Sequence, residues 1–434
     1  MQIFLRFFLI FVVLYHLFVT LFVYWIMKGQ YYEIFSLSKD LLRIVLILSS
    51  FVVYFKNIRS YLKLRAKPII LFVILIVFGL SVSYFQWKTP YDMFIWLKYG
   101  FLYIFTFLSA TWIGHNFAIK KNNDNMHKFI SFLKSFLCIT IIVSLLRQAL
   151  KFILPDFFQT IWYGPIWDYV FWQNPPLYYR TWPWGSPRLQ WIFSWPNNYG
   201  YFLVAFFGVF ISILNWYKNK SKEFWNFMLI ILRVISIVLT ISRSALIGSV
   251  LVLVLLNVSR IKKHRKIFVG LISIFILAIL GISIMKWWST LAHIHAKFSS
   301  LSYVFLQPLW YWLWTSWPAV FHNWSILPEN YYIQLLLDIW AIWLLIRAIL
   351  AKNISNIFNK IIKSEFIKKE EKYTYKIWLS WLLGLIWLLI IGLFLHVFED
   401  SMINYLFFSV FGIVTWYLYQ FAIIHKNNKS NKNQ

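Results

Sequence analysis

Side chains that could bind or transform an anionic substrate gather at three places in an otherwise apolar sequence. These places are the segments 188–200, 240–248 and 307–343. Arginine offers a planar fork of donors that suits phosphate and carboxylate, while glutamate and histidine can accept a proton as a general base. The combination favours a reaction in which cations hold an anion while a base deprotonates a second group.

Arg188 opens the first segment, where a long polar and aromatic loop enters an apolar run. A cation at the edge of an apolar helix is costly, so its presence needs a reason. Clamping a phosphate group would supply that reason. The alternative is an interfacial arginine whose long side chain simply reaches the polar headgroups.

Arg243 stands between two hydrophobic runs and has no acidic neighbour in sequence. The amides of a helix that starts near Ser244 would add positive potential, which invites an anionic ligand. The alternative is an ion pair with Asp156 or Asp168. Ser242 and Ser244 have no local base, so we expect them to cap the helix rather than act as nucleophiles.

Carboxylates and a histidine supply the candidate bases of the third segment. Glu329 lies at the mouth of an apolar run and could deprotonate a hydroxyl acceptor, or simply cap a helix. His322 could take either a catalytic or a structural role. Asp338 would lie about 13 Å below Glu329 along a helix, and a carboxylate at that depth is a functional candidate by default. This chemistry requires no metal and no other cofactor.

Apolar helices must position all of these residues. The composition is 61% hydrophobic and 13% charged, against about 25% charged in an average soluble protein. It excludes a water-soluble fold, and apolar runs of about 18 to 25 residues recur along the chain. We expect an all-α integral membrane protein with about 12 transmembrane helices. The spans cover about 3–27, 41–55, 68–86, 93–114, 129–148, 197–216, 224–241, 244–259, 267–286, 330–350, 377–397 and 402–424.

The basic residues predict how these spans are oriented. The formal net charge is +28, and most Lys and Arg fall in the even-numbered connections and in the basic tail 425–434. Because Lys and Arg are retained in the cytoplasm, both termini are expected there. Two long extracytoplasmic loops follow, 147–196 and 286–329. We expect one polytopic domain over 1–434, with the candidate residues gathered at its outer face.

The ordered set of motifs resembles the O-antigen ligase and O-antigen polymerase superfamily of bacterial polytopic membrane glycosyltransferases. That family shows an arginine motif ending in Pro-Asn before a span, a Ser-Arg turn between two spans, and a loop motif leading to His-Asn or Glu-Asn at a helix start. The resemblance covers about 188–345. The matching residues are Arg188 to Asn197, Ser242-Arg243, Pro308 to Thr315 and Glu329-Asn330.

The resemblance implies a function in surface polysaccharide assembly, including that of lipopolysaccharide. A glycan on a polyprenyl (undecaprenyl) diphosphate is transferred to an acceptor hydroxyl at the outer face of the cytoplasmic (inner) membrane. The implied partners are this donor, a glycan or lipid-core acceptor, and membrane lipid. Arg188 and Arg243 would bind the diphosphate, Glu329 or His322 would take the proton, and Asn197, Ser242 and Asn330 would support them.

Three interpretations of this function stay open. A polymerase is preferred, because ligases of the family use a histidine where this chain has Glu329. A ligase that transfers the glycan to a lipid core is the alternative, with His322 as the base. A lipid-linked glycan flippase or transporter is the alternative of another class, because it would also need cations for a diphosphate. A transporter would place those cations along a path inside the bundle and use broken helices.

Tryptophan stands where the family has glycine. The chain has 26 Trp and 14 Gly, and Gly to Trp adds the largest side chain where a backbone must bend or approach closely. Some bacterial lineages read the codon UGA as glycine, whereas another variant code reads it as tryptophan. We therefore hypothesise that the gene was translated with the wrong code. The positions are Trp191, Trp195, Trp310, Trp312, Trp314, Trp340 and Trp343.

This hypothesis predicts that the seven positions are encoded by UGA, which sequencing the gene region checks directly. UGG codons there would refute it. The alternative is a genuine belt of interfacial tryptophans, although such belts cluster at helix ends.

Overall fold

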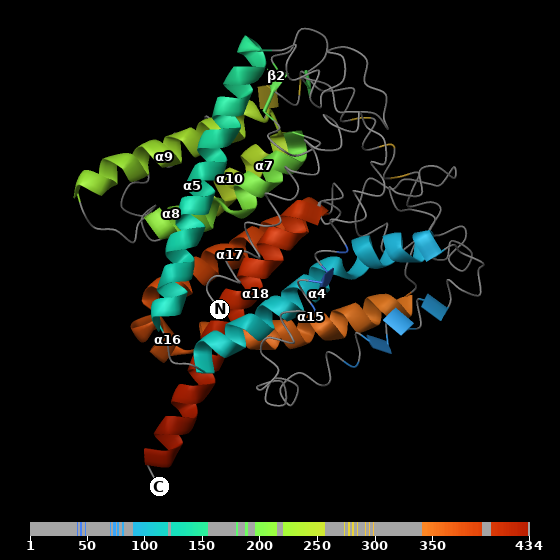
Figure 1. Ribbon diagram of the computed structural model, residues 1–434, viewed down its shortest axis with the longest axis vertical. Helices are drawn as coiled ribbons and strands as arrows, with labels where there is room; N and C mark the ends of the chain where they lie inside the picture. Colours follow the sequence, from blue (N-terminus) through green and yellow to red (C-terminus); the bar gives the residue numbers. More distant parts are fainter. Residues whose placement is uncertain are drawn as a thin grey trace. The chain divides into compact units, whose positions relative to one another are not determined.

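The described part of the chain is almost entirely helical. The computed structural model describes residues 90–119, 123–154, 179–180, 187–189, 196–214, 220–256, 341–392 and 401–432, together with single helical residues between 41 and 81 and between 273 and 298. Its helices are α4 (Pro90–Ile119), α5 (Asn123–Ile153), α7 (Pro196–Ala205), α8 (Phe207–Leu214), α9 (Lys220–Leu239), α10 (Arg243–Leu256), α15 (Ala341–Ile362), α16 (Glu365–Glu370), α17 (Lys372–Gly392) and α18 (Ser401–Lys432). Two strands, β1 (Tyr179–Arg180) and β2 (Pro187–Arg188), form an antiparallel pair (Figure 1).

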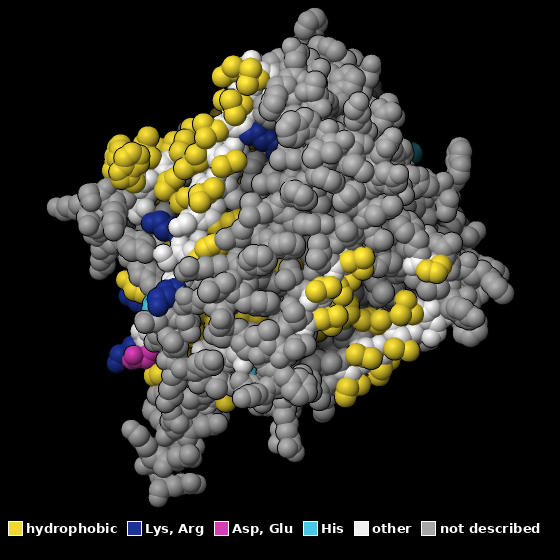
Figure 2. All heavy atoms as spheres, in the orientation of Figure 1, with side chains coloured by type: hydrophobic (Ala, Val, Ile, Leu, Met, Phe, Trp, Pro, Cys, Tyr) yellow, Lys and Arg dark blue, Asp and Glu magenta, His cyan; other side chains and the backbone are white. Residues whose placement is uncertain are grey.

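Several of these helices have the length and the apolar surface of membrane helices. Three described segments are long and apolar enough to cross one: Met126–Lys151, Lys372–Gly392 and Tyr405–Ile423. Large apolar side chains are exposed along α5 and α9, among them Ile139, Leu146 and Trp225. In the view of Figure 2, such side chains form a patch over α5 and α9. Exposed apolar area of this extent is typical of a lipid-facing surface, so the chain is an all-α membrane protein.

The described helices overlap eight of the expected spans and differ from them in detail. The span expected at 197–216 is interrupted at Phe206, between α7 and α8. α15 continues to Ile362 and α16 follows, both inside the connection expected at 351–376, while α18 continues through the tail to Lys432. The spans expected at 3–27, 41–55, 68–86 and 267–286 lie wholly or largely outside the described residues. Twelve spans in one domain therefore stay a prediction.

The chain divides into two compact units. Unit 1 comprises 1–46, 122–284 and 379–387, and its described elements are α5, β1, β2, α7 to α10 and the middle of α17. Unit 2 comprises 47–121, 285–378 and 388–434, and contains α4, α15, α16, α18 and the ends of α17. The described candidate residues all fall in unit 1.

Small residues let α4 and α18 of unit 2 pack closely. A Cβ added to Gly114 would collide with the carbonyl of Ile413, and one added to Gly412 would lie 2.7 Å from the Cβ of Ala110. Ala110 and Gly114 are four residues apart and therefore share one face of α4. Close backbone contact through small residues is a typical way for helices to associate in lipid.

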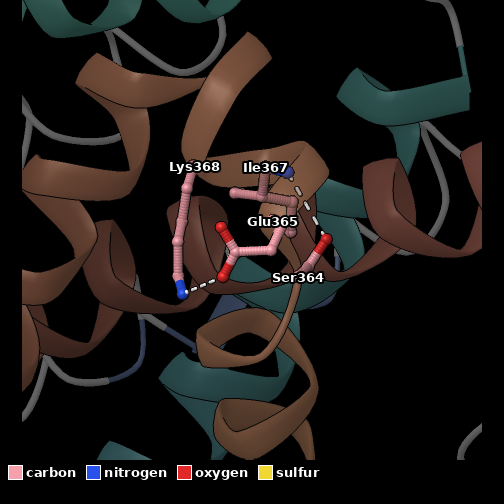
Figure 3. A network of polar contacts seen from close by, with 4 residues as sticks. All are labelled: Ser364, Glu365, Ile367 and Lys368. Atoms are coloured by element: carbon pink, nitrogen blue, oxygen red, sulfur yellow. Dashed lines mark hydrogen bonds and ion pairs between the residues drawn. The ribbon is translucent and has the colours of Figure 1, made fainter.

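Polar groups organise the start of α16, also in unit 2. The Oγ of Ser364 accepts a hydrogen bond from the amide of Ile367 at 3.4 Å, so Ser364 caps the helix. The ammonium of Lys368 donates to the Oε1 of Glu365 at 2.6 Å (Figure 3). This hydrogen bond raises the pKa of Lys368 above its usual value. The Glu365 side chain is 83% exposed, so the described protein does not cover it.

The exposure of Glu365 makes it a useful probe of the predicted topology. In a background with Cys138, the only cysteine, replaced by Ala, we expect an impermeant thiol reagent to label Arg180→Cys and Val320→Cys in intact cells. Glu365→Cys should react only after the membrane is opened, because the positive-inside rule places it in the cytoplasm. Labelling of Glu365→Cys in intact cells would contradict the predicted orientation of the chain in the membrane.

Candidate functional site

Four of the predicted site residues lie in described parts of unit 1. They are Arg188 in β2, Asn197 in α7, Ser242 before α10 and Arg243 at its first position. The other candidates, Glu329, His322, Asn330 and Asp338, lie outside the described residues. The structure therefore describes the arginines of the predicted site. The proposed general base, Glu329 or His322, stays a prediction.

Backbone contacts fix Arg188 against the end of α9. β2 pairs with β1 so that Arg188 faces Tyr179 across the ladder. The amide of the next residue, Leu189, donates to the carbonyl of Leu239 at 2.8 Å, and Leu189 is fully buried. The loop is thus anchored at the point where α9 ends.

The side chain of Arg188 then joins two segments that are distant in sequence. Its Nε donates to the carbonyl of Thr240 at 2.7 Å, and its Nη2 donates to the Oδ1 of Asn197 at 2.6 Å. Hydrogen bonds from a charged donor contribute about 1.5 to 3 kcal/mol each. The guanidinium of Arg188 therefore brings together two of the three candidate segments, 188–200 and 240–248. We call its hydrogen bonds to Thr240 and Asn197 the Arg188 bridge.

The turn that receives this bridge, residues 240–243, is locally strained. After α9 ends, the amide of Ile241 donates to the carbonyl of Val238 at 2.9 Å. Ile241 then adopts a φ of 48°, which is unusual for a β-branched residue because its Cβ approaches the following carbonyl. Such conformations persist where the surroundings hold them in place, often at functional sites.

Ser242 ends the turn as the cap of α10. Its Oγ accepts from the amide of Ala245 at 3.4 Å, which is the geometry of a helix N-cap. The capping role expected from the sequence is confirmed for Ser242, whereas Ser244 lies inside α10 as its second residue. The Oγ of Ser242 also lies 3.0 Å from the Oγ of Ser244, and Ser244 is 3.5 Å from the hydroxyl of Tyr201 on α7.

Gly200 allows α7 to lie directly against this turn. A Cβ at Gly200 would come within 2.9 Å of the Cβ of Ala245, 3.2 Å of the Oγ1 of Thr240 and 3.3 Å of the Cβ of Ser242. Real Cβ atoms do not approach so closely, so a larger residue would push α7 away. The sequence showed Gly200 beside the arginine motif but not that it packs against residues 40 positions later.

Arg188, Arg233 and Arg243 are cations of unit 1 whose side chains the structure describes. Two acidic residues, Asp124 in α5 and Glu223 in α9, also belong to helices of unit 1, and their side chains lie outside the described ones. Arg243 is partly exposed at the N-terminus of α10, where helix amides add positive potential. Asp156 and Asp168, the alternative partners of Arg243, lie outside the described residues. The arrangement can bind an anion.

Arg233 is a residue that the sequence reasoning missed. It lies in α9, has no exposed surface, donates through Nη2 to the carbonyl of Leu203, and lies over the ring of Phe210 at 5.0 Å. The sequence contains a signal for it, since Arg233 is the one charged residue between 224 and 241. An ionisable residue inside a span is a functional candidate by default.

Within the described ranges, no three His, Cys, Asp or Glu side chains lie close enough to hold a metal ion. The tryptophans at which glycine is suspected have no described side chains. Among the buried tryptophans that are described, Trp378 donates from Nε1 to the Oγ1 of Thr415 at 3.0 Å. Trp387 is different, because its Nε1 has no acceptor in the described structure and its ring presses on Gly248. A buried indole N–H usually finds a partner, so its codon also merits inspection.

Comparisons with protein-family models, curated proteins and solved structures found no match.

Proposed function

We propose that this protein is a metal-independent membrane glycosyltransferase of the O-antigen polymerase type. It transfers a glycan from polyprenyl diphosphate to the hydroxyl of an acceptor glycan, at the outer face of the bacterial cytoplasmic membrane. The observation that carries the proposal is the Arg188 bridge, which joins the arginine motif to the 240–243 turn that contains Arg243.

In the proposed reaction, the cations act on the diphosphate. The acceptor oxygen forms a bond to the anomeric carbon of the donor sugar, while the bond from that carbon to the diphosphate breaks and its electron pair leaves with the phosphate oxygen. Arg243 and the first amides of α10 would stabilise the charge that develops there. Arg188 would hold the turn in place through Thr240 and also face the anion.

The acceptor proton needs a base, and Glu329 is the candidate. Its carboxylate would take the proton as the acceptor oxygen attacks. His322 is the corresponding candidate in the ligase alternative. This choice rests on the family resemblance, in which ligases carry a histidine where this chain has Glu329.

A second candidate function is transport of the lipid-linked glycan. The fully buried Arg233 favours it, because ionisable residues inside a membrane often mark the path of a substrate or ion. Against it, Arg233 is bound to a protein carbonyl and packed on a ring, and the cationic turn lies at the end of its helices. Transfer therefore remains the preferred function.

A deletion strain distinguishes these functions by the state of its lipid-linked glycans. Loss of polymer with single repeats still transferred to the final acceptor supports the polymerase. Polymer left on its carrier indicates a ligase. Single lipid-linked repeats retained at the cytoplasmic face indicate a transporter. The same strain serves as the host in which variants are compared with the unmodified protein.

Arg243→Lys tests the cationic turn. Lysine keeps the charge but loses the planar fork, so we expect transfer to fall at least about tenfold while membrane insertion is normal. Polymer length and initial transfer rate in membranes are measured. Ile247→Val, one turn later on the exposed side of α10, is the matched control and should retain activity. Unmodified turnover in Arg243→Lys would assign Arg243 a structural role.

Glu329→Gln tests the base. Glutamine keeps the shape and hydrogen bonding of glutamate but removes its basicity, so turnover should fall about 100-fold or more while donor binding is nearly unchanged. If Glu329 only caps a helix, the change costs about 1 kcal/mol of local stability and little turnover. His322→Ala is the contrast, because only one position should behave as a base. Full activity in Glu329→Gln with collapse in His322→Ala would shift the assignment to a ligase.

A further inference from the structure

Residues 360–373 of unit 2 lie beside the ends of two candidate membrane spans, and we call them the boundary segment. The apolar span on α18 ends at Ile423, and the span on α17 begins at Lys372. The ring of Phe366 on α16 stacks on that of Phe421 in α18, with the ring centroids 5.4 Å apart. Because a helix advances about 1.5 Å per residue, this contact lies about 3 Å from the end of the α18 span.

Two further contacts attach the boundary segment to the same end of α18. The ammonium of Lys360, near the end of α15, lies over the ring of Tyr419, 5.6 Å from its centroid. Glu371 is buried, and its carboxylate accepts hydrogen bonds from the hydroxyls of Tyr417 and Thr374 at 3.0 and 2.8 Å. Both tyrosines fall in the last two turns of the α18 span. The segment therefore lies at the level where the apolar spans meet the aqueous phase.

The charge that the boundary segment exposes is mainly basic. Of its three carboxylates, Glu371 is buried among hydroxyls and Glu365 is bound by Lys368 (Figure 3). Glu370 is the third, and it opposes four lysines whose side chains are exposed: Lys360, Lys363, Lys369 and Lys372. A surface with this excess of positive charge attracts anionic groups.

Exposed apolar side chains stand next to these lysines. Ile362 precedes Lys363 and Tyr373 follows Lys372, and each of the two apolar residues is 37% exposed. Lysines that extend toward headgroups while apolar neighbours contact acyl chains are typical of segments that bind at a membrane surface. The level of the segment beside the span ends supplies such a surface, which favours lipid over a soluble acidic protein as its partner.

We propose that the boundary segment binds the phosphate groups of anionic phospholipids through Lys363, Lys369 and Lys372, while Ile362 and Tyr373 contact the acyl chains. The partner is the membrane around the protein, whose anionic headgroups carry the complementary charge. Binding holds the end of α15, α16 and the start of α17 at the interface. The inference does not depend on the proposed function, because it involves no residue of the candidate site in unit 1.

Contact between the segment and two lipids tests the inference in full-length protein reconstituted in vesicles. In the Cys138→Ala background, Ile362→Cys is labelled with bimane, a fluorophore that brominated acyl chains quench on contact. Brominated phosphatidylglycerol or brominated phosphatidylcholine is added to unbrominated phosphatidylcholine. One lysine near an anionic surface favours binding about fivefold. Half-quenching by the anionic lipid should therefore need a mole fraction at least about fivefold lower.

Charge variants locate the effect within the segment. Lys363→Gln, Lys369→Gln and Lys372→Gln combined should make the two lipids quench equally, because glutamine stays polar but carries no charge. Glu365→Gln should increase the preference, because it releases Lys368 from its ion pair.

Lys352→Gln is the control, because it removes one exposed charge of α15 about 15 Å from Ile362 along the helix. This distance exceeds the Debye length of about 8 Å at physiological ionic strength. The preference for the anionic lipid should therefore be unchanged in this variant.

Three results would overturn the inference. They are equal quenching by the two lipids in the unmodified segment, an unchanged preference in the triple variant, and no quenching by either lipid. Thermal unfolding of each variant checks that it is folded. If the triple variant does not fold, the unmodified segment is compared at about 0.1 M and about 1 M salt. The Debye length then falls from about 10 Å to about 3 Å, so the preference should be lost, and a preference that persists refutes the role of the lysines.

Discussion

One guanidinium connects the parts of unit 1 that the candidate site depends on. Arg188 donates to Thr240 at the end of α9 and to Asn197 at the start of α7. Removing it would leave the Thr240 carbonyl without this donor and would release α7 from the turn. The φ of Ile241, the cap at Ser242 and the close approach of Gly200 all occur within the region that this bridge holds together. Strain in the turn is thus balanced by contacts from outside it.

Hydropathy predicted the helical character of the described segments, because hydrocarbon allows only structures that satisfy their own backbone hydrogen bonds. A chain in hydrocarbon must satisfy its backbone hydrogen bonds internally, so long apolar runs become helices, and eight of the expected spans overlap described helices. Local signals worked as well, since a serine before a helix is a common cap and Ser242 proved to be one. These predictions needed only neighbouring residues.

What the sequence could not predict depends on contacts between distant segments. The hydrogen bond from Arg188 to Thr240 joins residues 52 positions apart. Neither segment contains a sequence signal that identifies the other as its partner. The interruption at Phe206 was unexpected for the same reason, because the donor to the nearby Leu203 carbonyl lies 30 positions away on α9. Arg233 was visible as a lone charge in an apolar run, but its partner carbonyl was not. The candidate general bases, Glu329 and His322, remain predictions because they lie outside the described residues.

The two arginines act at opposite ends of the same short helix. α7 has 10 residues and is therefore about 15 Å long, with Asn197 bound by Arg188 near its start and Leu203 bound by Arg233 near its end. The chain continues from α7 into α8 through hydrogen bonds from the amide of Phe206 to the carbonyl of Phe202 and from the amide of Phe210 to the carbonyl of Phe206. A helix as short as α7 has little stability of its own, so it depends on α8 and on these two arginine contacts. One acceptor of Arg188 is the neutral amide of Asn197, and an anion is a stronger acceptor for the same guanidinium. In the proposed reaction, an anion at the Nη2 of Arg188 would compete with the contact that holds Asn197 at the start of α7.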